Sequence, residues 1–73
     1  MTIGQRLKKA RKSRGYTRKL LANRVGIASG TLLRCEDDQG LLNLHTAALV
    51  ADELNISLDW LMGREGREYD NPV

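Results

Sequence analysis

The chain has 73 residues, of which 41% are hydrophobic and three are aromatic, and its formal net charge is +3 at pH 7. This length suits one small domain with an aliphatic core and leaves no room for a second core. No apolar run approaches the ~18 residues that cross a bilayer, and Arg6, Lys8 and Lys9 interrupt the apolar stretch that a signal peptide needs. We therefore expect a cytoplasmic protein with no membrane association.

The positive charge is concentrated in the first half of the chain. Residues 1–35 carry ten Lys and Arg side chains and no carboxylate side chain, whereas residues 36–73 carry nine acidic side chains against Arg64 and Arg67. A basic segment of this kind is typical of proteins that bind nucleic-acid phosphates, although a solvated helix face has the same composition.

Helical spacing of apolar residues predicts the first helix. Thr2 and Gln5 form a capping-box pattern, so this helix should begin near Ile3, and Gly15 should end it. Its inward stripe should consist of Ile3, Leu7 and Ala10.

Residues 18–37, RKLLANRVGIASGTLLRCED, have the spacing of a helix-turn-helix unit. Thr17 should cap the second helix through its hydroxyl. Gly26 breaks this helix where a left-handed residue is least costly, and the small Ala22 lets the third helix approach closely. The third helix should begin at Ala28 or Ser29, and Ser29 is the better cap by chemistry. The apolar positions of the unit are filled by Leu21, Val25, Ile27, Leu32 and Cys35. The sequence thus predicts a short helix held out where it can enter a groove.

Two further helices and a tail complete the predicted order. Asn43 should cap a fourth helix that runs to about Leu54, and Ser57 should cap a fifth over residues 58–62. We expect an all-α, five-helix domain over residues 1–63 and a flexible polar tail over residues 64–73.

Three segments, GYTRKLLANRVGI, TLLRCE and ADELNISLDWLMG, carry a family resemblance. They resemble the lambda-repressor/Cro-like (Xre-type) helix-turn-helix DNA-binding domain family, from about Ile3 to Gly63. The resemblance implies a phage or bacterial transcriptional regulator that binds double-stranded operator DNA, usually as a homodimer. It also implies a partly buried structural ion pair between Arg11 and Glu36.

Expected DNA contacts lie on the outward face of the third helix and beside it. This helix should enter the major groove, where each base pair displays a distinct pattern. Arg34 can give two hydrogen bonds to guanine, or can be a surface arginine that touches phosphate. The residues assigned to base reading are Ser29, Gly30, Leu33 and Arg34, and those assigned to phosphate are Arg18, Lys19, Thr31 and Asn43.

Several of these positions depart from the family pattern. Arg18 stands where Gln is common, and Ser29 and Gly30 are short where long polar side chains usually read bases. Asp37 and Asp38 are expected near the DNA backbone, where a carboxylate repels phosphate. Indirect readout of DNA shape should therefore carry much of the selectivity.

A symmetric dimer is expected, because one such domain makes too few contacts for tight operator binding. Side chains that exceed what the core can obviously bury are candidates for its interface: Leu41, Leu42, Trp60 and Met62. For Trp60 and Met62 the alternative is packing under the tail.

An enzyme is not expected, and neither is a metal, a cofactor or a small-molecule substrate. His45 has no paired nucleophile or ligand set, and Cys35 lies on an inward stripe. The alternative function is a protein-interaction module of the same fold with weak or lost DNA binding. The short base-reading residues, the two acids and the leucines expected to be exposed favour that alternative: Leu20, Leu33, Leu41 and Leu42.

Overall fold

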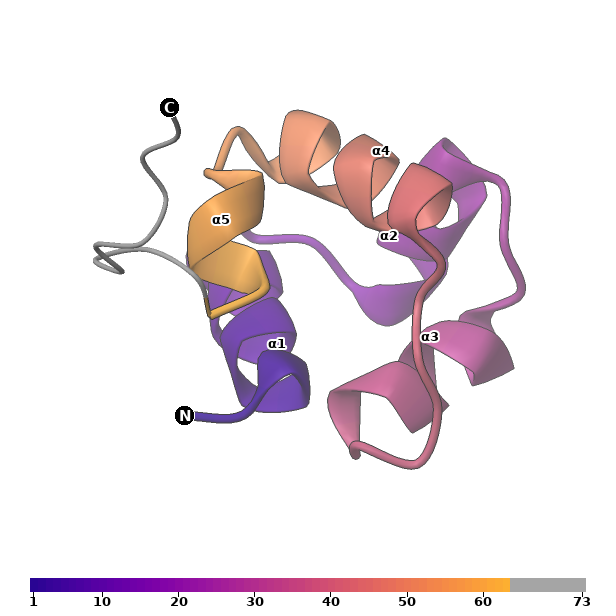
Figure 1. Ribbon diagram of the computed structural model, residues 1–73. Helices are drawn as coiled ribbons and strands as arrows, with labels where there is room; N and C mark the ends of the chain where they lie inside the picture. Colours follow the sequence, from indigo (N-terminus) through magenta and orange to yellow (C-terminus); the bar gives the residue numbers. More distant parts are fainter. Residues whose placement is uncertain (64–73) are drawn as a thin grey trace.

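The computed structural model describes residues 1–63, which form five helices and no strand (Figure 1). The helices are α1 (Ile3–Ser13), α2 (Arg18–Val25), α3 (Ser29–Glu36), α4 (Leu44–Leu54) and α5 (Leu58–Leu61). The predicted all-α class, with α2 and α3 as the helix-turn-helix, is confirmed. The predicted tail, residues 64–73, lies outside the described residues. In the part that the structure describes, no helix has the length and hydropathy needed to span a membrane.

Four of the five helices begin at a side chain that the sequence predicts as a cap. Thr2 and Gln5 form the capping box of α1, and the side chains that accept a backbone N–H at the starts of α2, α4 and α5 are those of Thr17, Asn43 and Ser57. Helix α3 is the exception, because it starts at Ser29 and its N-cap is Ala28, which has no side-chain acceptor. The prediction that Ser29 caps α3 is therefore wrong.

The turn between α2 and α3 explains this start. Gly26 adopts φ 81° and ends α2, and the N–H groups of Gly26 and Ile27 both donate to the carbonyl of Ala22 at 2.9 Å. Ala28, directly before α3, is extended. Turn geometry, rather than capping chemistry, thus fixes where α3 begins.

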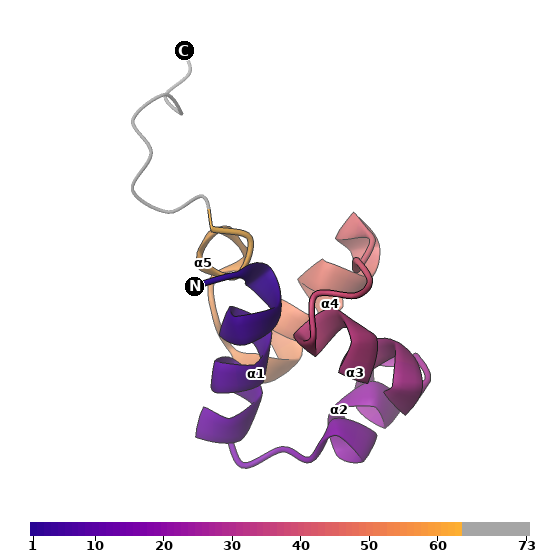
Figure 2. The ribbon, with the colours of Figure 1, turned by 90° about the horizontal axis from the view of Figure 1, so that it is seen from below.

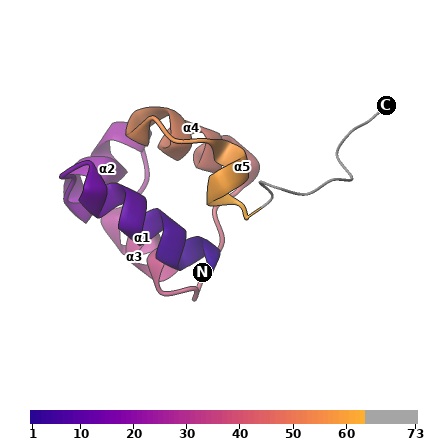
Figure 3. The same ribbon diagram turned by 90° about the vertical axis from the view of Figure 1, so that its left-hand side faces the viewer.

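The interior is aliphatic and receives side chains from all five helices. Figure 3 shows α1 lying across from α4, with α2 toward one end of the bundle and α5 toward the other. The largest fully buried side chains are Leu7, Leu21, Leu32, Val50, Leu54 and Leu61. Because α3 contributes Leu32 and Cys35 to this core, its opposite face is left at the surface.

Two arginines of the α1 segment bind the carboxyl ends of other helices. The Arg14 guanidinium donates to the carbonyls of Leu54 (2.7 Å) and Asn55 (3.1 Å) at the end of α4. Arg6 donates to the carbonyl of Trp60 at 3.1 Å and lies 5.4 Å from the centroid of its ring. These cations meet the negative ends of α4 and α5. Part of the basic first half therefore stabilises the fold.

Candidate nucleic-acid interface

Helix α3 presents one free face along the edge of the molecule (Figure 1). Seen from below, α3 lies in front of α4 (Figure 2). All four residues predicted to read bases are exposed: Ser29, Gly30, Leu33 and Arg34. Leu33 is 38% exposed, and within residues 1–63 the Arg34 side chain makes no hydrogen bond or ion pair. The face is thus open to a ligand.

The amino end of α3 carries backbone donors that no side chain satisfies. Ala28 provides no capping oxygen, and within the described residues the N–H groups of Ser29 and Gly30 have no hydrogen-bond acceptor. Such an end has partial positive charge, which attracts anions. Because Gly30 has no other atom within 4 Å of its virtual Cβ position, a ligand can approach the backbone closely there.

A buried ionic triad fixes α3 to α1 and α2. Glu36 accepts hydrogen bonds from Arg11 Nε (2.6 Å, at Oε2) and Arg11 Nη2 (3.2 Å, at Oε1), and from Arg18 Nε (3.1 Å, at Oε1). The exposed fraction of these side chains is 0% for Glu36, 7% for Arg11 and 38% for Arg18. The ion pair implied by the family resemblance is present. Arg18, predicted to contact phosphate, is in addition held by Glu36.

The segment after α3 is fastened to the start of α1. Asp38, at φ 61°, accepts the Gly4 N–H at Oδ1 (3.0 Å) and the Thr2 hydroxyl at Oδ2 (2.6 Å). The expectation of a free Asp38 carboxylate facing DNA missed this role, because no local pattern pairs residue 38 with residues 2 and 4. Asp37 is exposed. The acidic turn therefore anchors α3 through one of its two carboxylates.

The residues predicted to bind phosphate lie on α2, on α3 and at the cap before α4. Arg18 and Lys19 begin α2, and Thr31 lies half-buried in the first turn of α3. The side-chain oxygen of Asn43 accepts the N–H of Thr46 at 2.8 Å as the cap of α4. Only the amide NH2 of Asn43 is then available to a phosphate.

Comparison with known proteins agrees with this geometry. A family model described as "Helix-turn-helix domain" matches residues 4–67. The chain is 34% identical over 65 residues to the HTH-type transcriptional regulator ImmR of Bacillus subtilis. The matched segment covers 89% of this chain and 51% of ImmR. The chain belongs to the lambda-repressor/Cro-like (Xre-type) helix-turn-helix family.

Two further members of this family extend the comparison. The chain is 34% identical over 64 residues to the cryptic phage CTXphi transcriptional repressor RstR of Vibrio cholerae, covering 88% of this chain and 57% of RstR. It thus spans about half the length of these curated relatives. SinR, a master regulator for biofilm formation solved in complex with DNA, superposes with a TM-score of 0.77 at 33% identity, over 82% of this chain and 97% of that chain.

The candidate dimer residues of this family member do not share one surface. Leu41 is 88% exposed, whereas Leu42 is partly buried and packs against the core, so its expected exposure is wrong. Leu41, Leu42 and the half-buried Met62 line one cavity of about 130 Å³, which also touches Cys35.

Burial raises the pKa of the Cys35 thiol, Arg34 lowers it and Glu36 raises it, so the thiol is neutral at pH 7.

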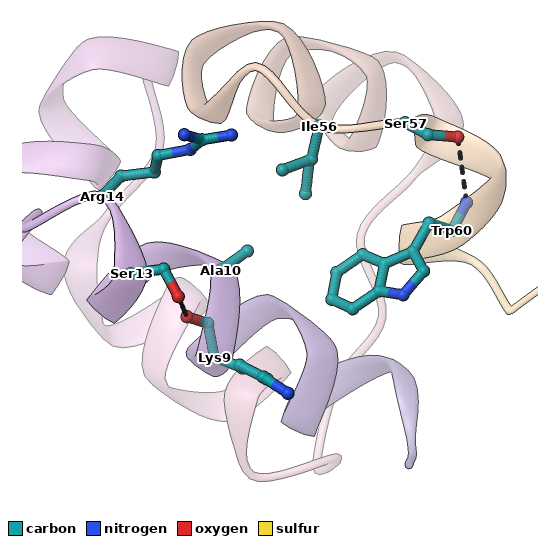
Figure 4. Close-up of a pocket in the computed structure, with 7 residues that line it drawn as sticks. All are labelled: Lys9, Ala10, Ser13, Arg14, Ile56, Ser57 and Trp60. Carbon is teal, nitrogen blue, oxygen red and sulfur yellow. Dashed lines mark hydrogen bonds between the residues drawn. The ribbon is translucent and has the colours of Figure 1, made fainter.

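Trp60 lies elsewhere, beside a larger hollow between α1 and α5. It is half-buried, packs against the core, and faces Ala10 and Ile56 across the hollow (Figure 4). The volume is about 400 Å³, and the lining residues are Lys9, Ala10, Ser13, Arg14, Ile56, Ser57 and Trp60. Within the described residues, no group of three or more His, Cys, Asp and Glu side chains could hold a metal ion.

The exposure of Leu44 is not predicted from the sequence. Leu44, the first residue of α4, is 70% exposed. Periodicity could not have found it, because Leu44 lies seven residues before the buried Ala51 and so shares its inward helical phase. Thr46 and Ala47 of the same turn are buried, whereas Leu44 and Leu41, on either side of Asn43, are exposed to solvent.

Proposed function

We propose that this chain is a sequence-specific DNA-binding transcriptional regulator that docks α3 in the major groove of an operator and binds as a homodimer. The observation that carries the proposal is the free face of α3, whose four outward residues are exposed while the buried triad holds the helix in place. Membership of the helix-turn-helix family supports it, as does the likeness to SinR, which is seen in complex with DNA.

Base reading is assigned to the free face of α3. Arg34 donates two hydrogen bonds to a guanine, which is worth ~1–3 kcal/mol of discrimination against the other bases. Leu33 packs on a thymine methyl group. Ser29 and Gly30 supply few side-chain contacts, so the shape and deformability of the duplex contribute to selectivity.

Phosphate contacts surround this face. The uncapped amino end of α3 and the amino end of α2 direct backbone N–H groups and partial positive charge toward the DNA backbone. The side chains that assist them are Arg18, Lys19, Thr31 and Asn43. These contacts set the register of the helix but read no sequence.

The experiment that tests the proposal is selection of bound sequences from a random duplex pool. We expect a two-fold symmetric operator for the parent chain. Arg34→Ala should relax the preference at one base pair of each half-site, whereas Lys12→Ala, at an exposed residue of α1, should leave the selected sequence unchanged. A uniform loss of affinity for all sequences in Arg34→Ala would contradict base reading by this residue.

The second candidate function is a protein-interaction module, and the exposed Leu41 and Leu44 favour it. A salt titration of duplex binding separates the two. Steep loss of affinity with rising salt indicates displaced counterions and hence phosphate contacts. Absence of duplex binding at low salt would favour the protein-interaction module.

A further inference from the structure

We propose that the buried Glu36 aims the guanidinium of Arg18 at a DNA phosphate, so that Arg18 binds the phosphate and Glu36 is its positioning residue. This inference rests on the proposed DNA binding and adds to it a residue that never touches DNA. Glu36 has a side-chain exposure of 0%, so any effect of this residue on phosphate binding must pass through a neighbour.

The charges of the triad do not balance. Two guanidinium groups share one carboxylate, which leaves one surplus positive charge at the junction of α1, α2 and α3. All three guanidinium nitrogens of Arg11 donate hydrogen bonds within the protein: Nε and Nη2 donate to Glu36, and Nη1 donates to the carbonyl of Tyr16 at 2.8 Å. The surplus charge therefore reaches solvent through Arg18, whose side chain is 38% exposed.

Glu36 does not require Arg18 as a neutralising partner. Arg11 already binds both carboxylate oxygens, at 2.6 and 3.2 Å, and is almost as buried as the carboxylate. Arg18 adds one contact at 3.1 Å through Nε alone. Within residues 1–63, the two terminal nitrogens of Arg18 make no hydrogen bond. This is the arrangement of a group that is held at one edge and offers its other edge to an anion.

A guanidinium fixed at Nε has a defined orientation, because the group is planar. Its two terminal nitrogens then form a fork that matches two phosphate oxygens. Holding Arg18 before DNA arrives also removes part of the rotamer entropy that a free long side chain loses on binding. Lysine has the charge but neither the Nε donor nor the fork, so it cannot be held by Glu36 while it binds phosphate.

The position of Arg18 links its proposed phosphate contact to base reading by α3. Arg18 is the first residue of α2, and Glu36 is the last residue of α3. The hydrogen bond between them therefore ties the phosphate-binding group to the helix that carries Leu33 and Arg34. A phosphate bound at Arg18 would set the depth and register of the base-reading face of α3.

The test measures binding to a mixed-sequence duplex as a function of salt, because a phosphate contact does not depend on sequence. We expect Arg18→Ala to bind about tenfold more weakly, with the log–log salt slope reduced by about 0.9 for each bound domain. Arg18→Lys retains the positive charge and hence the slope, but it should also lose affinity because it lacks the Nε donor and the fork. Lys12→Arg is the control, since Lys12 is an exposed cation outside the proposed DNA contacts and its side chain has no acceptor within the described residues; it should keep the parent affinity. Parent-like affinity in Arg18→Lys would overturn the positioning role.

A double-mutant cycle tests Glu36 itself. We expect Glu36→Gln to weaken duplex binding in the parent background and to cause no further loss in Arg18→Ala, whereas equal losses in both backgrounds would overturn the inference. Circular dichroism checks folding, and if Glu36→Gln is unfolded the Arg18→Lys comparison decides alone. If the parent chain fails to bind the duplex at low salt, the proposed function falls together with this inference. If the parent binds and Arg18→Lys is unchanged, this inference alone falls.

Discussion

The Glu36 side chain has no exposed surface, and the guanidinium groups of Arg11 and Arg18 lie against its carboxyl group. Desolvation of a charge is tolerated only when the charge is paired and its hydrogen-bonding capacity is used. Here the two carboxylate oxygens accept three hydrogen bonds from these arginines. The residue thereby joins three helices, and its loss leaves two guanidinium groups without their common partner.

We predict that Glu36→Gln lowers the free energy of unfolding by ~3–5 kcal/mol, because the buried Arg11 loses its counter-charge. Urea unfolding at low temperature measures the change. Glu53→Gln is the control: Glu53 accepts the Tyr16 hydroxyl at 2.6 Å and lies 3.8 Å from the exposed Arg24, and glutamine retains an acceptor for the hydroxyl. This control should cost less than ~1 kcal/mol. Equal stability of Glu36→Gln and the parent chain would show that the triad does not stabilise the fold.

At the scale of elements, the contact between the start of α1 and the end of α3 depends on a glycine. A Cβ at Gly4 would lie 2.5 Å from the Cys35 carbonyl oxygen, 2.6 Å from that of Glu36 and 2.7 Å from Asp38 Oδ1. Two of these atoms are backbone, so they cannot move without shifting α3. The hydrogen bond from the Gly4 N–H to Asp38 requires the same close approach.

We predict that Gly4→Ala destabilises the domain by about 1–3 kcal/mol through overpacking and the lost Asp38 contact. Gly30→Ala is the matched control within α3, because nothing lies within 4 Å of its virtual Cβ. It should leave stability unchanged or raise it by up to ~1 kcal/mol, since alanine favours helix over glycine. Thermal unfolding followed by circular dichroism compares the two variants. Similar melting temperatures for both would refute the close-packing role of Gly4.

The starts and ends of helices could be predicted from the sequence where residues of the same segment determine them. Thr2, Thr17, Asn43 and Ser57 cap the next few residues of their own chain segment, and Gly26 ends α2 by its own left-handed conformation. Contacts between distant segments carry no such signal. Hydrogen bonds that join residues 34, 40 and 54 positions apart hold Asp38, Arg14 and Arg6 in roles that the sequence does not indicate.

The same distinction applies to the candidate site. The exposed face of α3 follows from the phase of Leu32 and Cys35, and the structure places all four predicted base-reading residues on it. The periodicity of one helix does not predict which residues of other segments pack against it. Three features depend on how α1, α2, α3 and the turn after α3 pack together: the contact of Arg18 with Glu36, the role of Asp38 and the burial of Leu42.

At the scale of the whole molecule, the free face of α3 is the proposed DNA-binding surface, and the exposed Leu41 and Leu44 are candidates for a separate contact with another protein chain. Leu41, in the connection from α3 to α4, is 88% exposed, and Leu44, the first residue of α4, is 70% exposed. Neither packs against the core, so the monomer gains little from them. Large exposed apolar side chains that form one patch are candidates for a surface covered by a partner. In the proposed homodimer on a two-fold symmetric operator, that partner would be a second copy of this chain.

We predict that the double substitution Leu41→Ser and Leu44→Ser weakens dimerisation while it changes the stability of the monomer by no more than ~0.5 kcal/mol, because neither side chain is buried in the fold. Sedimentation equilibrium of the free protein and the cooperativity of operator binding measure the effect, and both should shift toward a monomer that occupies half-sites independently. Leu49→Ser is the control on α4, where Leu49 is 37% exposed; it should cost some monomer stability and leave dimerisation unchanged. A double variant that still binds its operator cooperatively would place the dimer contact on another surface.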